Sequence, residues 1–359
     1  MAEPRPLFCA KPFKRFEVSR RQGGLTHLCC SAWLKRAVGN LKEQSVAAVW
    51  NSVAAQEIRA SILDGSFSYC DRQRCPFLQT VSGPVSALAD VKDPELLAAV
   101  RERWTELPYG PRDISCAYDR SCNLACPSCR TAVVVETDRE QEIVAIQRKL
   151  NDEALKDAHV LSITGSGDPF GSPYFRRWLQ SMQRADMPRL RSIHLHTNAQ
   201  LWTPGTWATI PAEIRALVGS TEISIDAATA ATYAVNRQGG DFERLLRNLE
   251  LVRQLRREGP LRRVKISMVV QENNFTEMPE FVRLGQRLDV DCVYFSQLVD
   301  WQTFAPDELA ARSVHRPEHP RHRELVAVLK DRIFDDPKVD LGNLTEPRKR
   351  GLFEAGAAE

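Results

Sequence analysis

The stretch CNLACPSC, residues 122–129, places three cysteines, Cys122, Cys126 and Cys129, within eight positions. Thiolates are the usual ligands of iron–sulfur clusters and of zinc. Structural zinc normally takes four ligands, and no histidine or fourth cysteine follows here at the spacing of a zinc finger. A [4Fe–4S] cluster held by three cysteines leaves one iron with open coordination sites. The triplet therefore predicts a cluster that binds a further, chelating ligand.

The chain around the triplet has the rhythm of βα units, which indicates a parallel sheet. The expected strands are 113–118, 159–164, 192–197, 221–226, 263–270 and 291–297, so that the triplet lies in the loop after the first strand. The expected helices are 137–155, 172–185, 206–218, 228–258 and 276–288, with one more over 321–334. Six such units form either a partial (β/α) barrel or a doubly wound sheet.

The expected strands alternate apolar and polar side chains. Parallel strands buried on both faces are almost continuously apolar, so one face of this sheet packs against helices and the other is polar. We expect the polar face to line a ligand-filled lumen, although a sheet with one solvated face has the same pattern. The side chains expected in the lumen include His194, His196, Lys265, Cys292 and Tyr294.

The triplet and the loops after the later strands resemble, in order, those of radical S-adenosylmethionine (SAM) enzymes, over residues 111–300. SCNLACPSCR is similar to the cluster loop, GSGDP (165–169) to the glycine-rich loop that meets the SAM amino group, HTNA (196–199) to the Thr-Asn strand end, and SIDA (224–227) to the ribose-contacting element. The resemblance implies a partial (β/α)6 TIM-like barrel. It implies SAM contacts at Gly165, Ser166, Gly167, Asp168, Asn198, Ser224, Asp226 and Arg237, although Asp168 could instead fix its loop and Arg237 could lie on a solvated helix surface.

The resemblance also implies a mechanism. A flavodoxin- or ferredoxin-type protein reduces the [4Fe–4S] cluster held by Cys122, Cys126 and Cys129, and SAM is cleaved to methionine and a 5′-deoxyadenosyl radical. This radical abstracts hydrogen from an unactivated C–H bond of the substrate. The protein holds that bond close and excludes water.

A second cysteine set lies in the first 80 residues: Cys9, Cys29, Cys70 and Cys75. With the helical stretch 43–65 between them, these cysteines resemble the ligands of SPASM/twitch domains, which hold an auxiliary Fe–S cluster, here expected to be [4Fe–4S]. Cys30 could replace Cys29, and four cysteines are also a zinc pattern. Such domains usually follow the barrel, whereas this one precedes it.

Substrates of related twitch enzymes are often sugars or aminocyclitols that are dehydrogenated or epimerised at a carbinol carbon, and a polar lumen suits them. An epimerase must return a hydrogen atom to the opposite face of the radical, for which a thiol is the natural donor. Cys292 and Cys116 are the candidate donors, and a buried structural cysteine is the alternative for each. Modification of a peptide is the enzymatic alternative, and a non-catalytic electron carrier or scaffold is the other.

Composition sets the remaining expectations. Apolar residues make up 43% and charged residues 26% of the 359, and the net charge is +3, with no long basic run. We therefore expect a globular protein with neither a nucleic-acid nor a membrane partner, located in a reducing cytoplasm. The expected order is a cysteine-rich α+β domain (1–80), a connector with a short helix (81–110), the barrel (111–300), and a C-terminal helical extension and tail (301–359).

Overall fold

The computed structural model describes residues 6–19 and 23–348, so the end of the expected tail lies outside the described residues. The chain forms two compact units, each made of several chain segments. The first unit comprises 1–120, 136–166 and 181–193, and the second comprises 121–135, 167–180 and 194–359. Each is described by itself below.

The first unit contains five neighbouring strands in the order β4 (Gly39–Asn40), β3 (Leu25–His27), β2 (Arg15–Val18), β6 (Asp113–Cys116) and β7 (Val160–Ile163). β6 pairs with both β2 and β7 in parallel, and Phe16 lies opposite Ile114. A separate antiparallel pair joins β1 (Leu7–Cys9) to β5 (Val85–Ala87). The N-terminal segment thus shares a sheet with the first strands expected for the barrel.

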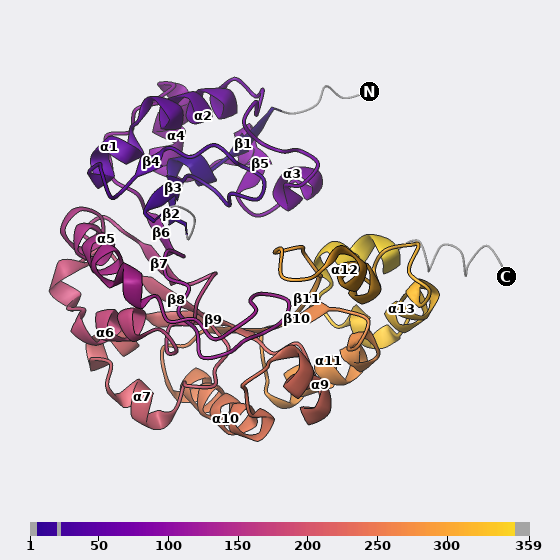
Figure 1. Ribbon diagram of the computed structural model, residues 1–359. Coiled ribbons are helices and arrows are strands. Elements are labelled where there is room, and N and C mark those ends of the chain that lie inside the picture. Colours follow the sequence, from indigo (N-terminus) through magenta and orange to yellow (C-terminus); the bar gives the residue numbers. More distant parts are fainter. Residues whose placement is uncertain (1–5, 20–22, 349–359) are drawn as a thin grey trace, which may run out of the picture. The chain divides into compact units, whose positions relative to one another are not determined.

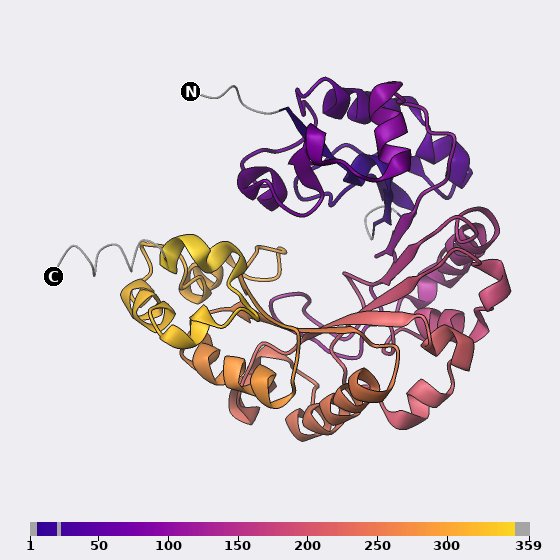
Figure 2. The same cartoon turned by 180° about the vertical axis from the view of Figure 1, so that it is seen from behind.

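Five helices belong to the first unit: α1 (Val46–Trp50), α2 (Val53–Leu63), α3 (Pro76–Thr80), α4 (Pro94–Arg101) and α5 (Glu140–Glu153). In Figures 1 and 2, α1, α2 and α4 lie on one side of β2–β4. The single helical stretch expected over 43–65 is wrong, because the chain breaks at Asn51 and Ser52. There the Ser52 side chain accepts the N–H of Ala55 and starts a new helix.

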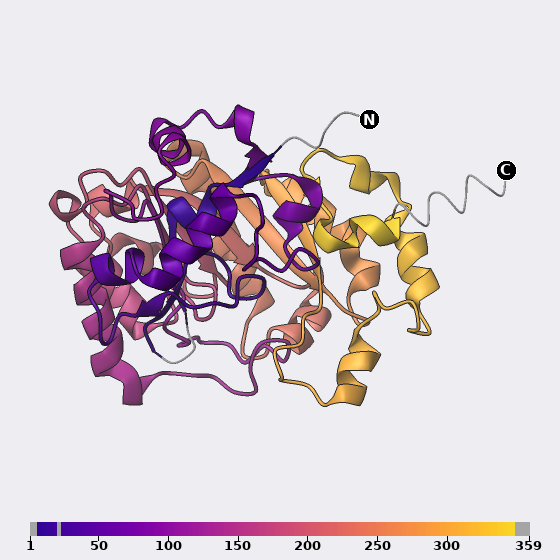
Figure 3. The same ribbon diagram turned by 90° about the horizontal axis from the view of Figure 1, so that it is seen from above.

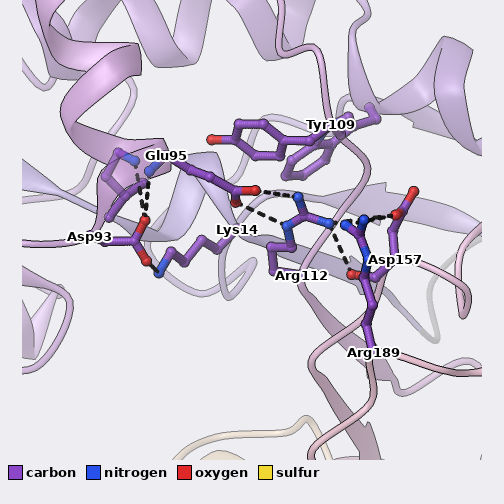
Figure 4. Close-up of polar contacts among 9 residues, drawn as sticks. Lys14, Asp93, Glu95, Tyr109, Arg112, Asp157 and Arg189 are labelled. Carbon is purple, nitrogen blue, oxygen red and sulfur yellow. Dashed lines mark hydrogen bonds and ion pairs between the residues drawn. The ribbon is translucent and has the colours of Figure 1, made fainter.

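A charged network ties the connector to this sheet (Figure 4). The buried guanidinium of Arg112 donates to the Glu95 carboxylate on α4, at 3.0 Å from Nε, and to the carbonyl of Asp157 at 3.1 Å. Its guanidinium also lies 4.9 Å from the centre of the Tyr109 ring. The short helix expected within 81–110 is confirmed as α4, and Arg112 fixes its position.

The second unit contains four strands that pair in parallel: β9 (Val218–Ser224), β10 (Arg263–Val270), β11 (Cys292–Gln297) and β12 (Val339–Asp340). Most of β8 (Ser192–Thr197) also belongs to this unit. The six strands expected from the sequence are therefore confirmed as β6–β11. The helices are α6 (Pro173–Ser181), α7 (Pro204–Ala208), α8 (Ala212–Arg215), α9 (Ala230–Asn236), α10 (Phe242–Glu258), α11 (Met278–Arg287), α12 (Pro306–Arg312) and α13 (His322–Leu329). The chain is mixed α/β with a parallel sheet, and the partial barrel remains a prediction.

The two faces of the sheet in the second unit differ as the alternation predicts. The side chains of Ile223, Ile266 and Phe295 are fully buried, while Glu222, Lys265 and Tyr294 on the other face are partly exposed. α10 and α11 lie along one side of β9–β11 in Figures 1 and 2. Figure 3 shows the C-terminal helices, in yellow, beside the orange strands.

The helix expected over 228–258 is wrong as one element, because it divides into α9 and α10. The break falls at Gly239, whose φ of +86° lies in the left-handed region that glycine adopts without strain. The resulting loop contacts the cysteine triplet, because the carbonyl of Gln238 accepts the N–H of Ala125 at 2.9 Å. No helix among the described residues is long and apolar enough to cross a membrane.

Candidate functional site

The four cysteines expected to bind an auxiliary cluster line one pocket in the first unit. Cys9 ends β1, Cys29 follows β3, Cys70 precedes α3 and Cys75 caps α3. The pocket is otherwise mostly apolar, with Trp33, Phe67 and Phe77 among its lining residues and Lys11 as its charged group. Cys30 is not among the described residues that line it, so the structure favours Cys29 as the ligand.

Burial is the main electrostatic influence on these thiols. It raises the pKa of Cys9 to about 12 and that of Cys70 to about 11. The indole N–H of Trp33 donates to the Cys29 sulfur at 3.2 Å. Among the described residues, no three His, Cys, Asp or Glu side chains converge on a point that one metal ion could occupy. The four thiols line the pocket, and four cysteines are the usual ligand set of a [4Fe–4S] cluster.

The triplet lies in the second unit, in a loop whose backbone is fixed at two points. The N–H of Cys122 donates to the carbonyl of Val134 at 2.9 Å, and the N–H of Ala125 donates to Gln238 as described above. Leu124 is fully buried between two of the cysteines and forms a small cluster with them. Cys122 and Cys126 are buried and Cys129 is partly exposed, so the thiols are sheltered and still reachable.

Each sulfur of the triplet accepts a hydrogen bond from a different side chain. Asn198 Nδ2 lies 3.6 Å from Cys122 Sγ, and Arg237 Nη1 lies 3.5 Å from Cys126 Sγ. Arg130 Nη2 lies 3.4 Å from Cys129 Sγ. Asn198, Arg237 and Arg130 each donate a hydrogen bond to a cysteine sulfur, and we call these three side chains the thiol donors. Such donors suit negatively charged thiolates, the form in which cysteine binds metal.

The glycine-rich loop after β7 is held at both of its ends. In the first unit, the Ser166 hydroxyl donates to the carbonyl of Ala117 at 2.7 Å, and the Cα of Gly165 faces open space. In the second unit, both carboxylate oxygens of Asp168 are occupied. One accepts the N–H groups of Phe170 and Gly171, and the other accepts Thr197 and Asn198. Of the two roles expected for Asp168, the structure favours fixing the loop.

Asp226, just after β9, is buried and fully engaged. It has a φ of +62°, and its carboxylate accepts the N–H of Val269 at 2.7 Å and pairs with Arg237 at 2.8 Å. Burial raises the pKa of Asp226, and Arg237 opposes that rise. Its carbonyl accepts the side-chain amides of Asn236 and Asn274, both at 3.0 Å. Asp226 therefore holds Arg237 in place, a contact that the expected ribose role did not include.

The polar face of the second unit is arranged in layers set by strand register. Glu222, Lys265 and Cys292 are direct neighbours across β9, β10 and β11, and Lys265 forms an ion pair with Glu222. Lys265 Nζ also lies 4.7 Å from the centre of the Tyr294 ring. Burial acts to raise the pKa of Glu222, but the charges of His196 and Lys265 bring it below its ordinary value.

Neighbouring side chains extend this face toward the strand ends. His196 Nε2 and the hydroxyl of Ser224, a predicted SAM contact, lie 2.9 Å apart, and His194 Nδ1 lies 2.9 Å from the hydroxyl of Ser220. Cys292 is the first residue of β11 and shares the polar face. Cys116, the other candidate donor, is fully buried beside Val18 and Ile163, so the structure places it in the core.

Sequence reasoning missed several of these side chains. Arg130 follows the last cysteine directly, and a cation beside a thiolate is a signal that could have indicated it. Glu222 lies on the polar face by the same alternation that indicated Lys265. Asn236 and Asn274 carry no local signal, because their partner, the carbonyl of Asp226, is distant in sequence.

Comparison with known proteins identifies the first cysteine set. Residues 9–76 match the family model of SPASM, an iron–sulfur cluster-binding domain. This segment is therefore similar to a SPASM domain, and the similarity supports the prediction of an iron–sulfur site at Cys9, Cys29, Cys70 and Cys75. A SPASM domain together with a C-x3-C-x2-C loop is consistent with a SPASM-containing radical SAM enzyme.

No curated protein matches the chain in sequence. Among solved structures, the chain is similar to Streptococcus suis SuiB bound to precursor peptide SuiA, with 15% identity, 82% of this chain and 64% of that chain covered, and a TM-score of 0.41. It is also similar to anSMEcpe with bound AdoMet and Cp18Cys peptide, with 18% identity, coverage of 60% and 56%, and a TM-score of 0.42. The chain is similar as well to TYW1 with a lysine–pyruvate adduct bound, with 15% identity, 60% of this chain and 70% of that chain covered, and a TM-score of 0.37. The chain therefore spans less than two thirds of SuiB and of anSMEcpe.

Proposed function

We propose that the protein is a radical SAM enzyme with an auxiliary cluster in its SPASM domain. The observation that carries the proposal is the triplet itself: three sheltered thiols in one loop, each with its own hydrogen-bond donor and no fourth cysteine in the loop. Cys122, Cys126 and Cys129 would hold a [4Fe–4S] cluster, which would supply one electron for the cleavage of SAM to a radical that abstracts hydrogen from C–H bonds. A flavodoxin- or ferredoxin-type protein is the reductant that this chemistry requires.

The chain's own residues position and shelter the reactants. Asp168 holds the loop after β7 against the end of β8, and the backbone of this loop is the proposed contact of the SAM amino group. Asp226 and Asn274 hold the ends of β9 and β10 together. Rigid strand ends of this kind reduce the entropy that is lost when a substrate is oriented. Seven of the ten cysteines are proposed cluster ligands, and clustered reduced cysteines of this kind suit a reducing compartment such as the cytoplasm.

We further propose that the polar face binds the substrate. The ion pair of Lys265 and Glu222, with Tyr294 and His196 beside it, offers both donors and acceptors, which suits a hydroxyl-rich or aminocyclitol-like molecule. The reaction is then dehydrogenation or epimerisation at a carbinol carbon. Cys292, on this face, is the thiol that would return a hydrogen atom in an epimerisation, and the resulting thiyl radical would take an electron and a proton from the reductant side. Solvent deuterium in the product formed in D2O, and an oxidised product from Cys292→Ala, would support this role; an unchanged product from that variant removes it.

A peptide substrate is the second candidate, and one observation favours it. Loops of the second unit expose apolar side chains, with Val133 at 55%, Val299 at 52% and Trp301 at 49% exposed. A peptide would cover apolar side chains of this kind, which a sugar would leave in contact with water.

Production of 5′-deoxyadenosine tests the proposal. Anaerobically reconstituted protein, reduced with dithionite in the presence of SAM, should release 5′-deoxyadenosine, and Cys126→Ala should abolish the release. Absence of the product from cluster-loaded wild-type protein would leave an electron carrier or scaffold as the function. Added aminocyclitols or short peptides then discriminate the substrate classes by which of them accelerates the release.

A further inference from the structure

We propose that the three thiol donors, Asn198, Arg237 and Arg130, raise the reduction potential of the cluster held by Cys122, Cys126 and Cys129. The inference rests on the proposed function and assigns these side chains a role as positioning residues that act through the cysteine ligands. It replaces the SAM-carboxylate role that the sequence suggested for Arg237.

The arrangement is specific in its geometry. Each donor reaches a different sulfur, at 3.6, 3.5 and 3.4 Å in turn, and each comes from a different place in the chain: the end of β8, the end of α9 and the triplet loop. Asn198 is 5% and Arg130 6% exposed, and the Arg237 side chain is 11% exposed. Charges and hydrogen bonds in such shielded positions act more strongly than they would in water.

The direction of the effect follows from charge. Reduction adds one negative charge to a group that three thiolates already make negative. A neighbouring cation or N–H donor stabilises that added charge, and hydrogen bonds to the sulfurs and the net charge of the surroundings are known determinants of iron–sulfur potentials. The thiol donors include two arginines, so they favour the reduced state, the state that must donate to SAM.

Arg237 acts as half of a pair. Its guanidinium lies between the Asp226 carboxylate, at 2.8 Å, and Cys126. Removing Arg237 alone would leave a buried carboxylate without its cation, and the protein could fail to fold for that reason. The double variant Asp226→Asn/Arg237→Gln removes the donor and its counter-charge together. Arg130 and Asn198 can be tested one at a time.

The test is a redox titration of reconstituted full-length protein, monitored by electron paramagnetic resonance. The relevant cluster is recognised in the wild type as the one whose spectrum changes when SAM is added, and the titrations are then made without SAM. Arg130→Gln should lower the equilibrium constant for reduction at least tenfold, which is 59 mV for one electron. Asn198→Ala and the Asp226→Asn/Arg237→Gln variant should lower it by at least threefold.

Two variants serve as controls. Arg130→Lys keeps the charge and should stay within threefold of the wild type. Arg253→Gln removes an arginine paired with Glu250 on the surface of α10, and it should leave the constant unchanged. Constants within twofold of the wild type in all three donor variants, with iron and sulfide contents unchanged, would overturn the inference. So would an Arg237 effect confined to SAM affinity. A wild type with no SAM-responsive cluster would instead overturn the proposed function.

Discussion

The carboxylate of Asp168 accepts a hydrogen bond of 2.8 Å from the hydroxyl of Thr197, and so joins the glycine-rich loop to the end of β8. The same oxygen accepts the N–H of Asn198, whose side chain is a thiol donor. One buried carboxylate thereby sets the positions of two loops that belong to different βα units. The predictions below begin with this residue.

Asp168→Asn should destabilise the second unit by roughly 1–3 kcal/mol, because an amide group replaces one acceptor oxygen and leaves two buried donors without a partner. The melting temperature of the reconstituted protein measures the loss, and the KM for SAM should rise with it. Asp152→Asn, at an exposed position on α5, is the matched control. Equal melting temperatures for Asp168→Asn and the control would contradict the role of Asp168 as a loop-fixing residue.

Cys29→Ala should lower the iron content of reconstituted protein from about eight to about four atoms per chain, since each [4Fe–4S] cluster holds four. Cys30→Ala should keep the wild-type content, because Cys30 is not among the described residues that line the pocket. Iron and sulfide assays measure both. The reverse result would identify Cys30 as the ligand, and a single tightly bound zinc would identify the alternative metal.

Arg112→Met should cost about 1–3 kcal/mol of stability, because Glu95 loses its cation and Asp157 keeps only Arg189, a loss that the partial exposure of Glu95 reduces. Thermal unfolding measures this. Arg253→Met breaks an exposed pair on α10 and should change the melting temperature little, because solvent screens the interaction. Comparable losses in the two variants would show that the network in Figure 4 contributes little.

Acidification should lower the melting temperature, and the protonation of His315 should account for part of that decrease. Burial lowers the pKa of His315 to about 4, with further lowering by Arg316, His322 and His319. Between pH 6.5 and 4 the unfolded chain binds a proton that the folded protein does not, so stability decreases as the pH falls through this window. After allowance for partial exposure, the decrease is roughly 1–2 kcal/mol.

His315→Gln should remove that part of the pH dependence. The measurement is the change in melting temperature between pH 7 and pH 5 in the wild type and in the variant. A variant that loses as much stability as the wild type over this interval would show that other groups account for the acid sensitivity.

Much of the second unit could be predicted from the sequence, because its signals are local. The alternation of Ile223 with Glu222, and of Ile266 with Lys265, marked both the strands and their polar face. The cysteine spacing likewise predicted two sets of candidate cluster ligands without any knowledge of the fold. Strand alternation and cysteine spacing can be recognised within a few residues, without knowledge of long-range contacts.

The remaining features depend on contacts that are distant in the sequence. The break before α10 follows a helical pattern that continues through Gly239, and only the conformation of that glycine reveals the loop. The pairing of Asp226 with Arg237 and the approach of Arg237 to Cys126 need the strand ends in place. No local pattern predicts that the segment Arg15–Val18 pairs with a strand almost a hundred residues later.

The parallel pairing of β2 with β6 limits how the N-terminal segment can be removed from the rest of the chain. A shortened protein that starts at residue 111 would lose β2 and expose the backbone N–H and C=O groups along one edge of β6. Exposed edges of this kind invite pairing between molecules and aggregation. The segment that resembles a SPASM domain therefore contributes a strand to the same sheet as β6 and β7. Gene fusions or deletions that remove it must supply another strand to cover the β6 edge, which limits how freely recombination can rearrange the segment and the rest of the chain.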